Sequence, residues 1–164
     1  MSVAIYPGSF DPMTNGHLSI IKSGLVVFDK LIVAVLRNPR KEALFTVEER
    51  VEMIREELAG AGKDVEVDSF DGLLVEYCKK KNVRVVLRGL RAVADFEYEL
   101  QMANMNRHLN TQVETVFLMA NDAYFYVSSN IVKEAWRLGG DVTRLVPKSI
   151  AHRLDEKMAS VEKS

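Results

Sequence analysis

The chain has 164 residues, of which 48% are hydrophobic and 27% charged, so it is long enough for one domain with its own core and unlike a disordered chain. Its 22 lysines and arginines against 23 acidic residues give a net charge of −1, which argues against a dedicated duplex-binding protein and predicts no nucleic acid partner. A single cysteine excludes an internal disulfide framework and a thiolate metal cage.

Short apolar runs alternate with longer stretches of helical periodicity. Five runs rich in Val, Ile and Leu predict buried strands at Val3–Tyr6, Lys30–Leu36, Val65–Val67, Val83–Leu87 and Thr115–Met119. Amphipathic stretches predict helices near His17–Phe28, Val47–Leu58, Leu73–Lys80, Asp95–Leu109, Ser129–Leu138 and Ser149–Met158. Strict alternation predicts an α/β fold: a single domain with a doubly wound, parallel, five-stranded sheet and helices on both faces.

The ends of the chain and its hydropathy set further expectations. We expect the domain to span residues 1–158 and a polar tail to occupy residues 159–164. No apolar run approaches the roughly 18 residues of a membrane span, and no signal peptide precedes the first predicted strand. These features predict a cytoplasmic protein with no membrane partner.

The loop after the first predicted strand has the composition of a phosphate site. Ligands of open parallel sheets bind at the carboxyl ends of strands. Here Gly8 and Gly16 allow close approach of the backbone, and free N–H groups at the start of the next helix can bind an anion. The hydroxyl of Ser9 and the imidazole of His17 can meet the same phosphate. Taken alone, His17 is more typical of a surface histidine, but the twelve-residue arrangement is far more specific.

Positive charges follow the second and fourth predicted strands. Three cations, Lys41 among them, follow the second strand, where a solvated loop is an equally good explanation. Arg88 and Arg91 follow the fourth strand, and their planar guanidinium groups suit phosphate. Salt bridges to Asp95 or Glu99 would also explain these two arginines.

Helix-capping residues mark two further loops. Ser128 and Ser129 are typical helix N-caps, and the same hydroxyl and N–H groups can bind phosphate. Thr46 followed by Glu49 predicts an N-cap with a capping box, which is a structural role.

Three of these segments resemble the motifs of a known family. Thr14-Asn15-Gly16-His17 resembles the (H/T)xGH signature of the nucleotidyltransferase superfamily, and the whole stretch from Tyr6 to His17 is similar to that of bacterial phosphopantetheine adenylyltransferases. Arg88–Glu99 is similar to a second motif of that family, and Val127–Glu134 resembles its (I/V)SSxxVKE segment. The motifs occur in the expected order, and the resemblance covers nearly the whole chain. It implies a Rossmann-like nucleotidyltransferase fold.

The resemblance also implies an activity. Members of this family reversibly transfer AMP from ATP to 4′-phosphopantetheine, giving dephospho-coenzyme A and pyrophosphate in the penultimate step of coenzyme A synthesis. The acceptor phosphate is ionised at pH 7, so direct in-line attack needs no protein nucleophile and no covalent intermediate. The resemblance further implies Mg²⁺ delivered with ATP and not held by protein ligands. It implies a homohexamer of two trimers, with coenzyme A as a feedback inhibitor.

Individual roles follow from the same resemblance. His17 would stabilise the transition state, and Lys41 and Ser9 would complete the catalytic set. The acceptor would contact Ser9, Lys41, Leu74 and Arg88. ATP would contact Ser9, Phe10, His17, Gly89, Leu90, Arg91, Glu99, Tyr124, Phe125, Tyr126, Val127, Ser128, Ser129 and Asn130. The chain departs from the family pattern at Ser9, where threonine is usual, at Ala120, where proline is usual, and at Asn130, where a small hydroxyl residue is common.

Other interpretations of the sequence remain open. A nucleotidyltransferase acting on nicotinate mononucleotide or a phosphorylated alcohol would share the first loop. A nucleotide-binding regulator could retain the pocket without turnover, and a structural oligomer module would leave the cations at the strand ends unexplained. A class I aminoacyl-tRNA synthetase has a related loop, but this chain is too short for its tRNA-binding parts.

Overall fold

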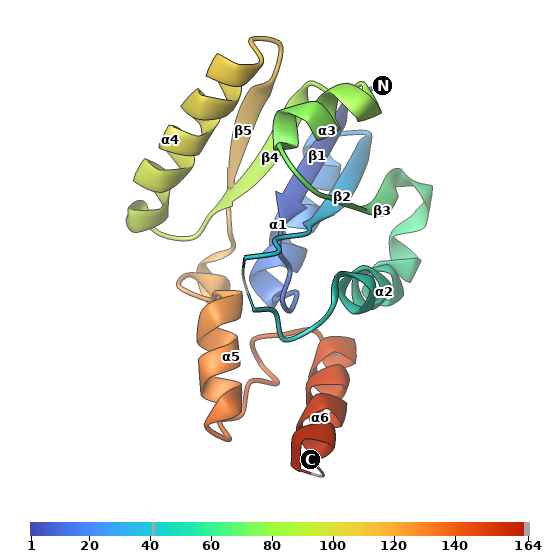
Figure 1. Cartoon of the computed structure of the whole chain (residues 1–164), viewed down its shortest axis with the longest axis vertical. Helices are drawn as coiled ribbons and strands as arrows, with labels where there is room; N and C mark the ends of the chain where they lie inside the picture. The colour runs from blue at the N-terminus through green and yellow to red at the C-terminus, as the bar shows by residue number, and fades with distance from the viewer. Residues whose placement is uncertain (41, 163–164) are drawn as a thin grey trace.

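The computed structural model describes residues 1–40 and 42–162 of the chain. Five parallel strands form one sheet: β1 (Val3–Gly8), β2 (Lys30–Leu36), β3 (Val65–Phe70), β4 (Val85–Leu90) and β5 (Glu114–Met119). The α-helices are α1 (Asn15–Val27), α2 (Val47–Glu57), α3 (Leu74–Lys81), α4 (Val93–Leu109), α5 (Ser129–Arg137) and α6 (Lys148–Glu162). Two short 3₁₀ helices, η1 (Ala59–Asp64) and η2 (Asp122–Tyr124), were not predicted. The predicted fold class is confirmed (Figure 1).

Two hydrophobic clusters cover the two faces of the sheet. Along β2, Leu31 and Val33 belong to the larger cluster, whereas Ile32 and Ala34 belong to the smaller one, as the alternation of a strand requires. Helices α1, α2, α5 and α6 contribute to the larger cluster, and α3 contributes to the smaller. The sheet is therefore buried on both faces, which explains the uninterrupted apolar runs of its strands.

The strand order is β3-β2-β1-β4-β5, so the order reverses between β1 and β4. The ladder between these two strands ends at the pair Ile5–Val86. Beyond this pair, β1 remains paired with β2 as far as Gly8, whereas β4 remains paired with β5 as far as Leu90. The two halves of the sheet thus diverge at their carboxyl ends, at the point where open α/β sheets bind ligands.

Several predicted boundaries are wrong. β1 continues to Gly8, and β4 is displaced toward the C-terminus, so that Arg88 lies inside the strand and not after it. Arg88 stays in the strand because β5 continues to pair with it, at Phe117. The last helix runs to Glu162, so the end predicted at Met158 is too early.

Helix α4 differs from the other helices. It lies along the β4–β5 side of the sheet (Figure 1) and leaves many apolar side chains exposed. These are Val93, Phe96, Tyr98, Leu100, Met102, Met105 and Leu109. In the described part of the chain, no helix has the length and apolar character needed to cross a membrane.

Candidate active site

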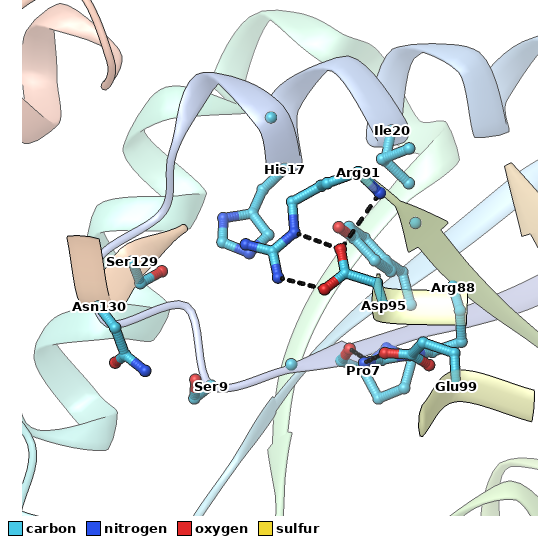
Figure 2. A pocket seen from close by; sticks show the side chains of 14 residues that line it. Pro7, Ser9, His17, Ile20, Arg88, Arg91, Asp95, Glu99, Ser129 and Asn130 are labelled. Carbon is cyan, nitrogen blue, oxygen red and sulfur yellow. Dashed lines mark hydrogen bonds and ion pairs between the residues drawn. The ribbon is translucent and has the colours of Figure 1, made fainter. Parts of the chain in front are cut away.

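A cavity of about 210 Å³ opens where β1 and β4 diverge. Its walls come from the end of β1, the first turns of α1, the end of β4, helix α4 and the start of α5 (Figure 2). The lining residues are Tyr6, Pro7, Gly8, Ser9, Gly16, His17, Ile20, Arg88, Gly89, Arg91, Asp95, Glu99, Ser129 and Asn130. Segments that are far apart in the sequence therefore meet at one predicted phosphate site.

His17 lies in the first turn of α1, where the backbone fixes its ring. Thr14 is the N-cap of this helix, and its hydroxyl accepts a hydrogen bond from the backbone N–H of His17 at 3.4 Å. In return, the backbone N–H of Thr14 donates to Nδ1 of His17 at 2.9 Å. Because Nδ1 accepts this bond, the proton of the neutral imidazole is on Nε2.

The surroundings of His17 keep the imidazole neutral. Burial, followed by the positive charges of Arg91 and Arg88, lowers the pKa of His17 from 6.5 to about 3. His17 is therefore a neutral hydrogen-bond donor at pH 7. Its ring lies beside the Arg91 guanidinium at the cavity (Figure 2).

Two arginines of the cavity are held by carboxylates. Arg88 donates to Glu99 through Nε at 2.8 Å and Nη2 at 2.5 Å, and its Nη1 donates to the carbonyl of Pro7 at 2.6 Å, across the gap between β4 and β1. Arg91 pairs with Asp95 at 3.2 Å. These are the salt bridges that the sequence left as an alternative explanation. The arginine side chains remain 31% and 36% exposed, so an anion can still reach them.

Gly89 is required by packing between β4 and α1. A Cβ atom at this position would lie 2.7 Å from Cγ1 of Ile20, which is closer than real Cβ contacts. The glycine thus lets the first turns of α1 approach β4 and brings His17 near the two arginines.

The predicted site residues fall into several groups. The cavity is lined by Ser9, His17, Arg88, Gly89, Arg91, Glu99, Ser129 and Asn130. Lys41 lies outside the described residues.

The remaining predicted contacts lie around the cavity. Phe10 is buried, with its ring centroid 4.9 Å from that of His17. Tyr124 packs against Gly16, and the carbonyl of Val127 accepts a bond from Arg91 at 3.0 Å.

Other predicted ATP contacts line an apolar pocket of about 430 Å³, which has Arg91 in common with the first cavity. They are Leu90, Phe125 and Tyr126.

The two serines before α5 have different roles. Ser128 is the N-cap, because its hydroxyl accepts a bond from the backbone N–H of Ile131 at 3.2 Å. The prediction that Ser129 also caps the helix is wrong. Its hydroxyl donates to the carbonyl of Pro12 at 2.7 Å, which ties the start of α5 to the first loop. The capping box of Thr46 and Glu49 is confirmed.

A second cavity of about 390 Å³ adjoins the first. The two cavities share Ser9, Arg88 and Glu99 among their lining residues. The second has more apolar than polar lining, with side chains that include Leu36, Phe70, Leu73, Leu74 and Met102. The predicted acceptor contact Leu74 therefore lies in an apolar groove that leads away from the arginine cavity.

Sequence reasoning missed part of the cavity wall. No individual role is predicted above for Tyr6 or Ile20, and Asp95 is predicted only as a possible salt-bridge partner of the arginines, yet all three line the cavity. The pairing of Asp95 with Arg91 joins the first turn of α4 to the residue that follows β4 and places this carboxylate at the cavity wall. Within residues 1–40 and 42–162, no three His, Cys, Asp or Glu side chains gather as a metal site would need.

The family to which the sequence belongs defines a class of enzyme. The model of the cytidylyltransferase-like family matches residues 5–135 of the chain. A bifunctional NMN adenylyltransferase/ADP ribose pyrophosphatase from Francisella tularensis has the same fold, with a TM-score of 0.71 over 97% of this chain and 50% of that one, at 15% sequence identity. The chain is thus a nucleotidyltransferase by fold and family.

Sequence relatives narrow this class. The chain is 53% identical over 161 residues to the phosphopantetheine adenylyltransferase of Desulfosudis oleivorans, covering 98% of this chain and 95% of that protein. It is 56% identical over 161 residues to the phosphopantetheine adenylyltransferase of Syntrophus aciditrophicus, covering 98% and 97%. The chain belongs to the phosphopantetheine adenylyltransferase family.

Proposed function

We propose that this protein transfers AMP reversibly from ATP to 4′-phosphopantetheine, giving dephospho-coenzyme A and pyrophosphate, by one direct in-line displacement. One observation carries the choice of acceptor: the arginine cavity opens into an apolar groove of about 390 Å³, with Ser9 and Arg88 at the junction. An acceptor with a phosphate at one end and a long, flexible arm fits this pair of cavities.

The reaction needs positioning and charge stabilisation. An oxygen of the acceptor phosphate attacks the α-phosphorus of ATP, a new P–O bond forms, and the bond to the β-phosphate breaks so that pyrophosphate leaves with the electron pair. The neutral Nε2–H of His17 donates to an α-phosphate oxygen and stabilises the charge that grows there. No proton has to be removed from the nucleophile.

The acceptor phosphate binds at the junction of the two cavities. Arg88 neutralises its charge, Ser9 orients it through the hydroxyl, and Lys41 contributes a movable positive charge to the same transfer. The pantetheine arm then follows the groove past Leu74. Arg88 changes part of its hydrogen bonding from Glu99 to the incoming phosphate.

ATP occupies the other side of the cavity. The segment Gly89–Arg91 and the residues Tyr124–Asn130 enclose the nucleotide, with Phe10 contributing a backbone N–H and Glu99 a polar contact. Arg91 and the start of α5 are the groups suited to the triphosphate.

Magnesium arrives with ATP in this scheme. The cavity carboxylates Asp95 and Glu99 accept hydrogen bonds from arginines and do not converge on a common point with a third acidic ligand in the described residues. With both carboxylates engaged by arginines, we assign the Mg²⁺ ligands to ATP and water. Phosphate oxygens and water are the ligands that Mg²⁺ takes in such complexes.

Self-association accompanies this function. Seven apolar side chains of α4 and Met119, which is 69% exposed, face solvent, and exposed apolar surface of this kind is typical of contact sites between proteins. We propose that α4 contributes to a homohexamer of two trimers, that coenzyme A acts as a feedback inhibitor at the same cavity, and that the enzyme works in the cytoplasm.

The decisive experiment measures pyrophosphate release from magnesium-ATP with 4′-phosphopantetheine or nicotinate mononucleotide as separate acceptors. Release with phosphopantetheine alone, with dephospho-coenzyme A identified by mass, is the expected result. Release with the mononucleotide alone would overturn the acceptor, and binding of ATP without release would favour a regulator.

A further inference from the structure

A buried ion pair lies beside the cavity and has no place in the scheme above. Asp11 and Lys133 are 3% and 5% exposed, and Nζ of Lys133 lies 2.9 Å from Oδ2 of Asp11. Asp11 belongs to the first loop and Lys133 to α5, so the pair joins segments that are 122 residues apart. Both residues lie inside the motifs that carry the family resemblance, yet neither touches the cavity.

The carboxylate of Asp11 also holds the segment that leads into α2. The backbone N–H of Leu44 donates to Oδ2, and the N–H of Phe45 donates to Oδ1, both at 2.9 Å. With Lys133, the carboxylate accepts three hydrogen bonds that come from two different segments. Both oxygens act only as acceptors, so an amide side chain would direct its NH₂ group at one of these donors.

Arg50 also holds this junction, the place where the first loop and the segment before α2 meet α5. Its Nη1 donates to the carbonyl of Ser9 at 2.6 Å, and its Nε donates to the carbonyl of Phe45 at 3.1 Å. Between these ties lies Phe10, whose φ of 47° is in the left-handed region that side chains other than Gly, Asn and Asp rarely adopt. Such backbone persists where the surroundings over-determine it.

We propose that Asp11 and Lys133 are positioning residues for adenylyl transfer, which hold the Ser9–Phe10 backbone, the Leu44–Phe45 segment and the start of α5 in one catalytic arrangement. The role rests on the proposed function. Two of these segments supply the Ser9 hydroxyl and Ser129 to the cavity. Because in-line transfer depends on the relative placement of both phosphates, loosening this junction should lower kcat more than it weakens substrate binding.

The test replaces Lys133 by Met, which removes the ammonium group and keeps most of the aliphatic chain. We expect kcat to fall by about 10- to 100-fold while KM for ATP changes by less than about 3-fold. The amides of Leu44 and Phe45 should exchange their hydrogens at least about 10-fold faster than in the wild-type enzyme. Lys133→Gln is a milder change, because the amide keeps a hydrogen-bond donor. If Lys133→Met does not fold, Lys133→Gln takes its place in the test, and we expect a smaller loss of kcat.

The matched control is Ile32→Ala, which opens the hydrophobic cluster on the other face of the sheet. The melting temperatures of Lys133→Met and Ile32→Ala show whether the control is destabilised to a comparable degree. A kcat that stays at the wild-type value in both Lys133 variants would overturn the positioning role, as would an equal loss in Ile32→Ala. Wild-type enzyme that releases no pyrophosphate with phosphopantetheine would instead reject the proposed function, and this role with it.

Discussion

Two clusters of charged side chains lie near each other in this fold and differ in their exposure to solvent. In the cavity, the side chains of Arg88 and Arg91 are 31% and 36% exposed despite their carboxylate partners. In the neighbouring junction, the side chains of Asp11 and Lys133 are only 5% and 7% exposed. An open ion pair can exchange its partner for a ligand phosphate, whereas a closed pair cannot exchange and can only hold the backbone around it. Charge alone therefore does not distinguish a candidate ligand site from a structural ion pair, whereas access does.

The largest effect on the open cluster should come from His17→Ala. In the proposed mechanism the contact of His17 to the α-phosphate strengthens in the transition state, so we expect kcat to fall by about 10²-fold or more while ATP still binds with similar affinity. Steady-state kinetics and calorimetry of ATP binding measure the two quantities. Replacing the exposed His152 by Ala is the control. Normal turnover with a raised KM would contradict the assigned role.

Arg88→Ala should divide the open cluster into an acceptor part and a nucleotide part. Loss of a charged hydrogen bond to phosphate predicts a decrease of about 10- to 100-fold in kcat/KM for phosphopantetheine and a smaller change for ATP. Arg91→Ala is the matched variant, with the opposite preference expected. Equal losses for both substrates in both variants would show that the arginines do not divide the site in this way.

Gly89→Ala tests the packing that brings α1 to the open cluster. The new Cβ would lie 2.7 Å from Ile20, so we expect a loss of about 1–3 kcal/mol in the free energy of unfolding, measured by chemical denaturation. If the contact with Ile20 is the cause, the double variant Gly89→Ala/Ile20→Ala should lose less than the sum of the single changes. Strict additivity would indicate another cause.

How much of the fold and of the two clusters could be predicted from the sequence depends on whether the signal is local. Apolar runs predicted all five strands, and motif resemblance located the first loop, because both signals are local. The place of Arg88 inside β4 depends on pairing with Phe117 of β5, which no local pattern carries. The partners of Asp11 are two backbone N–H groups and a lysine 122 residues away, so its role depends on the folded chain.

The last prediction separates the two clusters by pH. The pKa of His17 is lowered to about 3 in the folded protein from about 6.5 in the unfolded chain, so below pH 6.5 the unfolded chain binds a proton that the folded protein does not. Stability should therefore be lost as the pH falls from 6.5 toward 3, with a slope of at most about 1.4 kcal/mol per pH unit for this one proton. In the closed cluster, burial alone would raise the pKa of Asp11, but hydrogen bonds from Leu44, Phe45 and Lys133 outweigh it and lower the pKa below 3.8.

The contribution of Asp11 is thus present above about pH 4 and is lost only below it, which leaves the range from pH 4.5 to 6.5 to the histidine. Chemical denaturation of His17→Asn across this range should give a shallower loss of stability than the wild-type protein, whereas His152→Asn serves as the control for an exposed histidine. If His17→Asn and the wild-type protein lose stability in parallel, the imidazole is not held neutral by its surroundings. His17 would then gain its proton within this pH range, and the open cluster would carry one more positive charge below about pH 6.5 than it does at pH 7.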